Sequence, residues 1–81
     1  MIKYYEIMAH TPLAGCDEYM YIRSDELKRD IEEIANDFAY DVGEEAFEYS
    51  GEEDFDYEDF MEACGYVINE ISEEEYNSYA N

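Results

Sequence analysis

The sequence predicts an α+β fold, in which a small three-stranded antiparallel sheet packs on one long helix in the order β-β-α-α-β-α. Three observations support this. Two runs rich in β-forming residues lie near the N-terminus, residues 25–49 repeat apolar side chains at helical spacing, and a third β-rich run precedes a helix-capping pattern. The chain has 81 residues, so we expect a single acidic domain, 1–81, with a modest core.

The N-terminal segment predicts two strands and a loop. Residues 2–9 are rich in β-forming residues, with two Ile and two Tyr, and predict a strand. Residues 10–17 contain the only Pro and a Gly, which predict a loop, and residues 18–23 predict a second strand antiparallel to the first. Ser24 then predicts a helix N-cap, with Asp25 and Glu26 in the first turn, where carboxylates meet the positive end of the helix dipole.

The segment 25–49 predicts the long helix. Its expected apolar face comprises Leu27, Ile31, Ile34, Phe38, Val42 and Tyr49, supplemented by Ala35 and Ala46. Gly43 is an expected weak point, because glycine inside a helix costs about 1 kcal/mol relative to alanine. Ser50 and Gly51 are expected to end the helix.

The C-terminal third predicts a short helix, a strand and a last short helix. Asp56 is the expected cap of the first helix, and Gly65 interrupts its pattern after the helically spaced residues Tyr57, Phe60, Met61 and Cys64. Residues 66–71 predict the third strand. Residues 72–75 (Ser-Glu-Glu-Glu) form a capping-box pattern that opens the last helix, with Tyr76 and Tyr79.

The charge is extreme and unevenly distributed. The chain holds 24 acidic against 4 basic residues, a net charge of −20, yet 47% of its residues are hydrophobic and 17% aromatic, which predicts a folded domain rather than an acidic tail. All four basic residues lie in the first 29 positions, which net −1, so residues 30–81 net −19. Direct binding to nucleic acid or to an anionic membrane is not expected, because phosphate contacts need Lys and Arg.

The sequence also indicates where the protein is located and whether its cysteines are reduced. No apolar run reaches the roughly 18 residues of a membrane span, and the N-terminus lacks the apolar stretch of a signal peptide. We therefore expect a cytoplasmic protein. Cys16 and Cys64 are expected to be free thiols, with a single bridge left open as the alternative.

A row of carboxylates is the main candidate functional feature. Acids separated by three or four positions share one side of a helix, and we expect seven of them to form a row along a flank: Glu26, Asp30, Glu33, Asp37, Asp41, Glu44 and Glu48. Each like-charged neighbour costs about 0.2–0.5 kcal/mol, so this row opposes folding. A second acidic run, with two candidate aromatic contacts, completes the predicted partner-binding set: Glu52, Glu53, Asp54, Asp56, Glu58, Asp59, Tyr40 and Tyr57.

A small, strongly acidic α+β domain with such a row resembles the DNA-mimic inhibitors encoded by phages and mobile elements, which include anti-CRISPR and anti-restriction proteins. The resemblance rests on charge and size over the whole chain. It implies an inhibitor that occupies the nucleic-acid-binding surface of a host bacterial defence complex. CRISPR effectors are the first expected targets, and restriction or other defence nucleases come next. Two alternatives remain: an acidic domain of a salt-adapted organism, or an acidic adaptor for another basic protein.

Catalytic and metal motifs are not evident in the sequence. Asp54, Asp56 and Glu58 alternate as in an EF-hand loop, but Asp59 and Gly65 stand where that loop needs Gly and Glu. His10 and the two cysteines lack zinc-ligand spacing. We expect no enzyme activity, no cofactor and no metal, and the sequence leaves the oligomeric state open.

Overall fold

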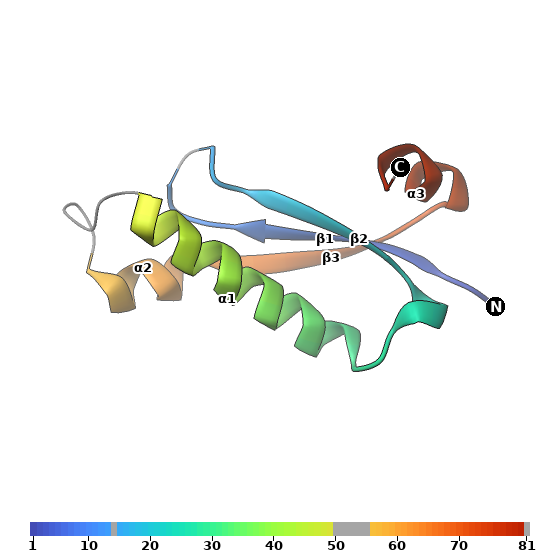
Figure 1. Cartoon of the computed structure of the whole chain (residues 1–81), viewed down its shortest axis with the longest axis horizontal. Coiled ribbons are helices and arrows are strands. Elements are labelled where there is room, and N and C mark those ends of the chain that lie inside the picture. The colour runs from blue at the N-terminus through green and yellow to red at the C-terminus, as the bar shows by residue number, and fades with distance from the viewer. Residues whose placement is uncertain (14, 50–55, 81) are drawn as a thin grey trace.

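The computed structural model describes residues 1–13, 15–49 and 56–80. The strands are β1 (Tyr4–His10), β2 (Glu18–Arg23) and β3 (Gly65–Ile71). The helices are a 3-10 turn η1 (Ser24–Glu26), α1 (Ile31–Tyr49), α2 (Tyr57–Ala63) and α3 (Glu73–Tyr79). The predicted α+β class and element order are confirmed (Figure 1).

The sheet has the strand order β2-β1-β3, and both pairings are antiparallel. In the central strand, Ile7 lies opposite Met20 of β2 and Ile68 of β3. Because side chains alternate along a strand, Tyr5, Ile7 and Ala9 share the inner face that α1 covers. Ile7 and Ala9 are fully buried, so the central strand supplies the middle of the core.

Helix α1 lies across the inner face, over β1 and β3 (Figure 1). Its buried side toward the sheet is made of Ala35, Ala39, Val42 and Ala46, and Ala39 and Val42 contact Ala9 of β1. The predicted apolar face is therefore partly wrong. Ile31, Ile34 and Phe38 are only half-buried, Leu27 precedes the helix, and Tyr49 is 83% exposed. Small side chains occupy the contact between α1 and the sheet, because they let the helix backbone approach the backbone of the strands closely.

The start of α1 also differs from the prediction. The helix begins at Ile31 because Ser24 does not cap it: the Ser24 Oγ accepts a hydrogen bond from the Lys3 backbone N–H at 2.8 Å. Asp30 takes the capping role, and its Oδ1 accepts from the Glu32 N–H at 2.8 Å. Asp25 instead forms a two-point contact with the Arg23 guanidinium, which lowers the pKa of the Asp25 carboxyl.

Gly43 is a contact point between helices rather than only a weak point. A Cβ there would lie 3.0 Å from the Cys64 Sγ and 3.1 Å from the Met61 Cε, so glycine allows this end of α2 to approach α1. Phe60 of α2 is 1% exposed and its ring lies 5.4 Å from that of Phe47. The expected stop at Ser50 and Gly51 lies outside the described residues, although α1 ends at the preceding Tyr49.

Helix α3 covers part of the outer face of the sheet. Its predicted cap is confirmed, because the Ser72 Oγ accepts a hydrogen bond from the Glu75 N–H at 3.1 Å. Tyr76 packs on Tyr4 with ring centroids 5.0 Å apart, and Tyr79 stacks on Tyr21 at 5.4 Å. Within the described residues, no helix combines the length and the apolar character needed to cross a bilayer.

We predict that Phe60→Ala lowers the free energy of unfolding by about 3–5 kcal/mol, because it empties the contact between α2 and α1. Urea unfolding followed by circular dichroism measures this change. The matched control is Tyr49→Ala, which truncates an exposed aromatic residue on α1 and should cost less than about 0.5 kcal/mol. Equal losses in both variants would show that α2 does not pack on α1.

Candidate acidic partner-binding surface

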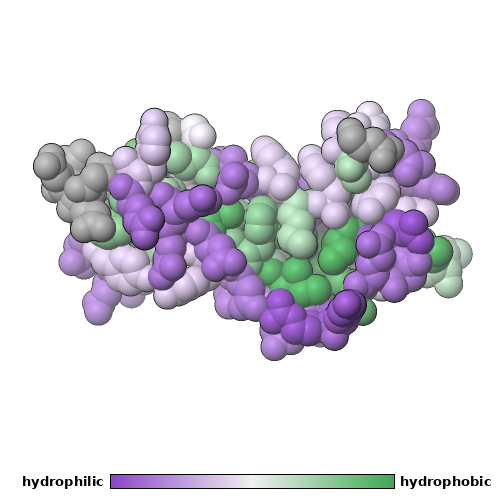
Figure 2. Space-filling model, in the orientation of Figure 1, coloured by the Kyte–Doolittle hydropathy of each residue, from purple (hydrophilic) through white to green (hydrophobic). Residues whose placement is uncertain are grey.

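Five of the seven predicted row residues lie on α1 and share one side of it. We call this set the acidic ridge: Glu33, Asp37, Asp41, Glu44 and Glu48. At about 100° per residue, the ridge is centred about 170° from the buried alanines and Val42, so it points away from the sheet rather than along a flank. Glu44 is half-buried and the other four are exposed. Figure 2 shows the corresponding hydrophilic band over α1.

Glu26 and Asp30 do not share this helical face. Glu26 lies in η1, where its Oε1 is 3.4 Å from the Arg23 Nε. Asp30 precedes α1 and its carboxylate is engaged in capping. The prediction of one seven-residue row is therefore wrong at its N-terminal end, because the chain leaves helical geometry between η1 and α1.

The cations neutralise only one end of the ridge. Arg29 Nη1 lies 2.6 Å from Asp37 Oδ2, and the pKa of Arg29 is raised by its hydrogen bond to Asp37, with a further contribution from the charge of Glu33. In the part of the chain that the structure describes, the remaining ion pairs join Lys3 to Glu70 and Arg23 to Asp25 and Glu26. Asp41, Glu44 and Glu48 therefore form no ion pair with any described residue.

The second acidic run continues beside the ridge on α2. Asp56, Glu58 and Asp59 are exposed, and the Asp56 side chain makes no capping hydrogen bond. Glu52, Glu53 and Asp54 lie outside the described residues. The contact of α2 with α1 near Gly43 brings the described α2 carboxylates to the same end of the molecule as Glu44 and Glu48.

The two candidate tyrosines lie together and join α1 to α2. The Tyr57 hydroxyl donates a hydrogen bond to Glu44 Oε1 at 3.0 Å, and its oxygen lies 3.3 Å from that of Tyr40. The hydrogen bonds to Tyr40 and to the Glu44 carboxylate raise the pKa of Tyr57. Tyr57 also packs edge-on against Phe47 at 5.2 Å. Sequence reasoning missed the link to Glu44, although the spacing of Tyr40 and Glu44 places them on one helix face.

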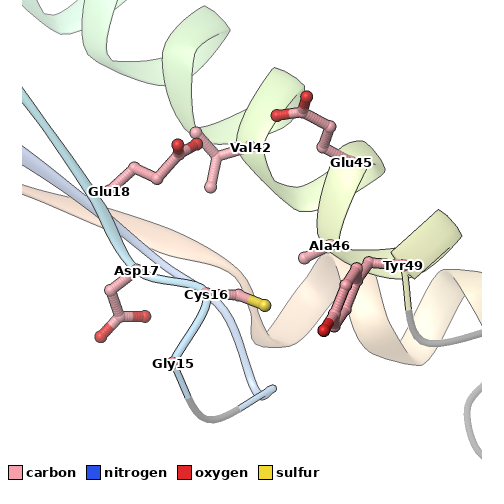
Figure 3. Close-up of a pocket in the computed structure, with 8 residues that line it drawn as sticks. All are labelled: Gly15, Cys16, Asp17, Glu18, Val42, Glu45, Ala46 and Tyr49. Atoms are coloured by element: carbon pink, nitrogen blue, oxygen red, sulfur yellow. The ribbon is translucent and has the colours of Figure 1, made fainter.

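A pocket of about 530 Å³ lies between the loop before β2 and the second half of α1 (Figure 3). The Cys16 thiol is directed toward its α1 wall, near Ala46 and Tyr49, and Glu18 and Glu45 bring carboxylates to its rim. Cys16 and Cys64 are free thiols, and burial raises the pKa of Cys64, which disfavours its reactive thiolate. Among the described residues, no three His, Cys, Asp or Glu side chains are grouped to hold a metal ion.

We predict that Tyr57→Phe lowers the free energy of unfolding at neutral pH. We also expect the free energy of unfolding of this variant to fall less steeply at alkaline pH than that of the wild type. The raised pKa means that the folded state keeps the Tyr57 proton when the unfolded chain begins to lose it near pH 10. The hydrogen bonds therefore stabilise the fold fully below pH 10 and are lost as pH rises through the folded pKa. Urea midpoints measured from pH 7 to alkaline pH test this, with Tyr49→Phe as the exposed-tyrosine control. Parallel pH profiles for Tyr57→Phe and the wild type would contradict the role of this network.

Comparisons with protein-family models, with curated proteins and with solved structures found no match. The functional inference therefore rests on the charges and contacts of this chain. Those contacts set two features side by side at one end of α1: unneutralised carboxylates and a tyrosine pair held by Glu44.

Proposed function

We propose that the protein binds the basic, nucleic-acid-binding surface of another protein and occupies it in place of nucleic acid. The observation that carries this proposal is the outward row of Asp41, Glu44 and Glu48, which no described cation neutralises. Repulsion along such a row opposes folding, so a compensating benefit is expected from an external cationic partner.

The charge spacing supports the comparison with nucleic acid. Ridge neighbours lie about 5–6 Å apart at Cβ, whereas one DNA strand presents a phosphate about every 3.4 Å of axial rise. The ridge alone is therefore sparser than one strand. The exposed carboxylates of Asp56, Glu58 and Asp59 lie at the same end of the molecule and raise the local charge density.

The residue types support the same contacts that phosphates make. Carboxylates accept charge-assisted, often two-point, hydrogen bonds from arginine. Tyr40 and Tyr57 are 51% and 40% exposed, and their ring faces offer surfaces on which arginine side chains stack. Because Glu44 holds the Tyr57 hydroxyl, these rings are ordered before a partner arrives, which lowers the entropic cost of binding.

The proposed target is a host bacterial defence complex, with CRISPR effectors ahead of restriction and other defence nucleases, and the proposed site of action is the host cytoplasm. In this proposal the protein acts by occupancy and performs no catalysis. An acidic adaptor for another basic protein, or a salt-adapted domain, would also be strongly charged, but neither requires competition with DNA.

We predict that the double variant Asp41→Lys, Glu48→Lys loses at least about a hundredfold in affinity for the target, since two charge-assisted contacts are reversed and each is worth about 1.5–3 kcal/mol. Glu44 is left intact to preserve the tyrosine network. Immobilised CRISPR effectors and restriction nucleases provide the targets, and displacement of bound duplex DNA provides the measurement, at low and high salt.

The matched control is Glu73→Lys, Glu74→Lys, which makes the same charge change on α3, with folding checked by circular dichroism. It should change affinity much less than the ridge variant. Equal losses in the two variants would attribute binding to net charge, and failure of the wild type to displace DNA from any target would overturn the proposal.

A further inference from the structure

One side of the inner sheet face lies open. Helix α1 lies over β1 and β3 rather than over β2. The register places Met20 and Ile22 of β2 on this inner face, opposite Ile7 and Tyr5. Both side chains are only half-buried.

The side of α1 that faces β2 is apolar in its first half. The pocket places Val42, Glu45 and Tyr49 toward the start of β2, and at about 100° per residue Ile31, Ile34 and Phe38 lie on that same side. All three are half-buried, and one side of Phe38 packs against the core residues Ala9, Ala39 and Val42. We call this surface the apolar flank: Met20, Ile22, Ile31, Ile34 and Phe38. Figure 2 shows a hydrophobic area beside the N-terminal half of α1, next to the hydrophilic band.

The apolar flank is large in comparison with the buried core. Among the described residues, the buried hydrophobic side chains larger than alanine are Ile7, Val42, Phe47 and Phe60. The apolar flank holds five large apolar side chains against four in the core, and because all five are already half-buried, covering the flank would remove only the exposed part of each from water.

The charges at the two ends of the apolar flank have opposite signs. Lys28 and Arg29 precede α1 at one end, and Lys28 forms no ion pair with any described residue. Glu18 and Glu45 lie at the other end, on the rim of the pocket (Figure 3). Positions 28 and 45 lie on either side of Phe38, the last apolar residue of the flank on α1.

We propose that the apolar flank is the interface of a homodimer. A two-fold axis near Phe38 sets the two flanks face to face in antiparallel orientation and brings Lys28 of each copy to Glu45 of the other. Most of the acidic ridge stays outside this contact, although Asp41 lies three residues from Phe38 and therefore at its edge. The two chains of net charge −20 meet with Lys28 and Arg29 at one end of the contact. A purely basic partner would instead be drawn to the ridge.

Sedimentation equilibrium tests the dimer. The wild type should have twice the monomer mass of 9.6 kDa, and Ile34→Glu should weaken association by at least about tenfold, because it places a carboxylate in the interface. The control Val67→Glu makes the same kind of change at a 42% exposed strand residue on the outer sheet face and should remain dimeric. A monomeric wild type, or dissociation by Val67→Glu alone, would overturn the proposal.

A charge swap tests the antiparallel arrangement and leaves all the apolar side chains of the flank unchanged. Lys28→Glu and Glu45→Lys should each weaken their own homodimer, because each creates two like-charged contacts. Mixed together they should form a heterodimer at least about tenfold tighter than either homodimer, because both contacts are then attractive. A mixture that associates no better than its components would contradict the arrangement. The single ridge variant Glu48→Lys, ten residues from Phe38, should stay dimeric while it weakens target binding, so loss of target binding and loss of dimerisation are separable.

Discussion

The small residues of α1 allow it to pack closely on the sheet and on α2, and this packing governs both the core and the distribution of charge. Ala35, Ala39 and Ala46 face the sheet, and Gly43 faces α2. None of these residues has a long side chain, so the helix backbone lies near both elements and the core stays thin. A thin core leaves larger apolar residues at the sides of α1 only half-covered, and this is the physical origin of the apolar flank.

The same constraint directs the charge. With the small residues turned inward, the carboxylates at the opposite side of α1 point into solvent, where water screens their mutual repulsion. Arg23 and Arg29 lie around η1 and the start of α1, where they pair with Asp25, Glu26 and Asp37. The molecule is thus electrostatically divided along α1, with a partly neutralised end and an end of unneutralised acids.

Hydrogen bonds of Tyr40, Tyr57 and Glu44 order part of the acidic surface at this end of α1. Tyr40 and Tyr57 come from different helices, their hydroxyls contact each other directly, and the Tyr57 hydroxyl also donates to Glu44, so part of the charged surface is fixed in position by hydrogen bonds. An ordered array of carboxylates and aromatic rings has less entropy to lose on meeting a cationic groove than mobile side chains would.

The class of the fold, the order of its elements, the bounds of the second strand and the cap of the last helix could all be predicted from the amino-acid sequence, because they depend on local periodicity and on short-range capping. Tertiary contacts decided the rest. The Ser24 hydroxyl bonds to the backbone of Lys3, 21 positions away, so α1 starts at Ile31 and the acidic row loses Glu26 and Asp30. The distances between separate elements decide which side of α1 is buried and which tyrosines contact each other. These distances cannot be predicted from the spacing of residues along one helix.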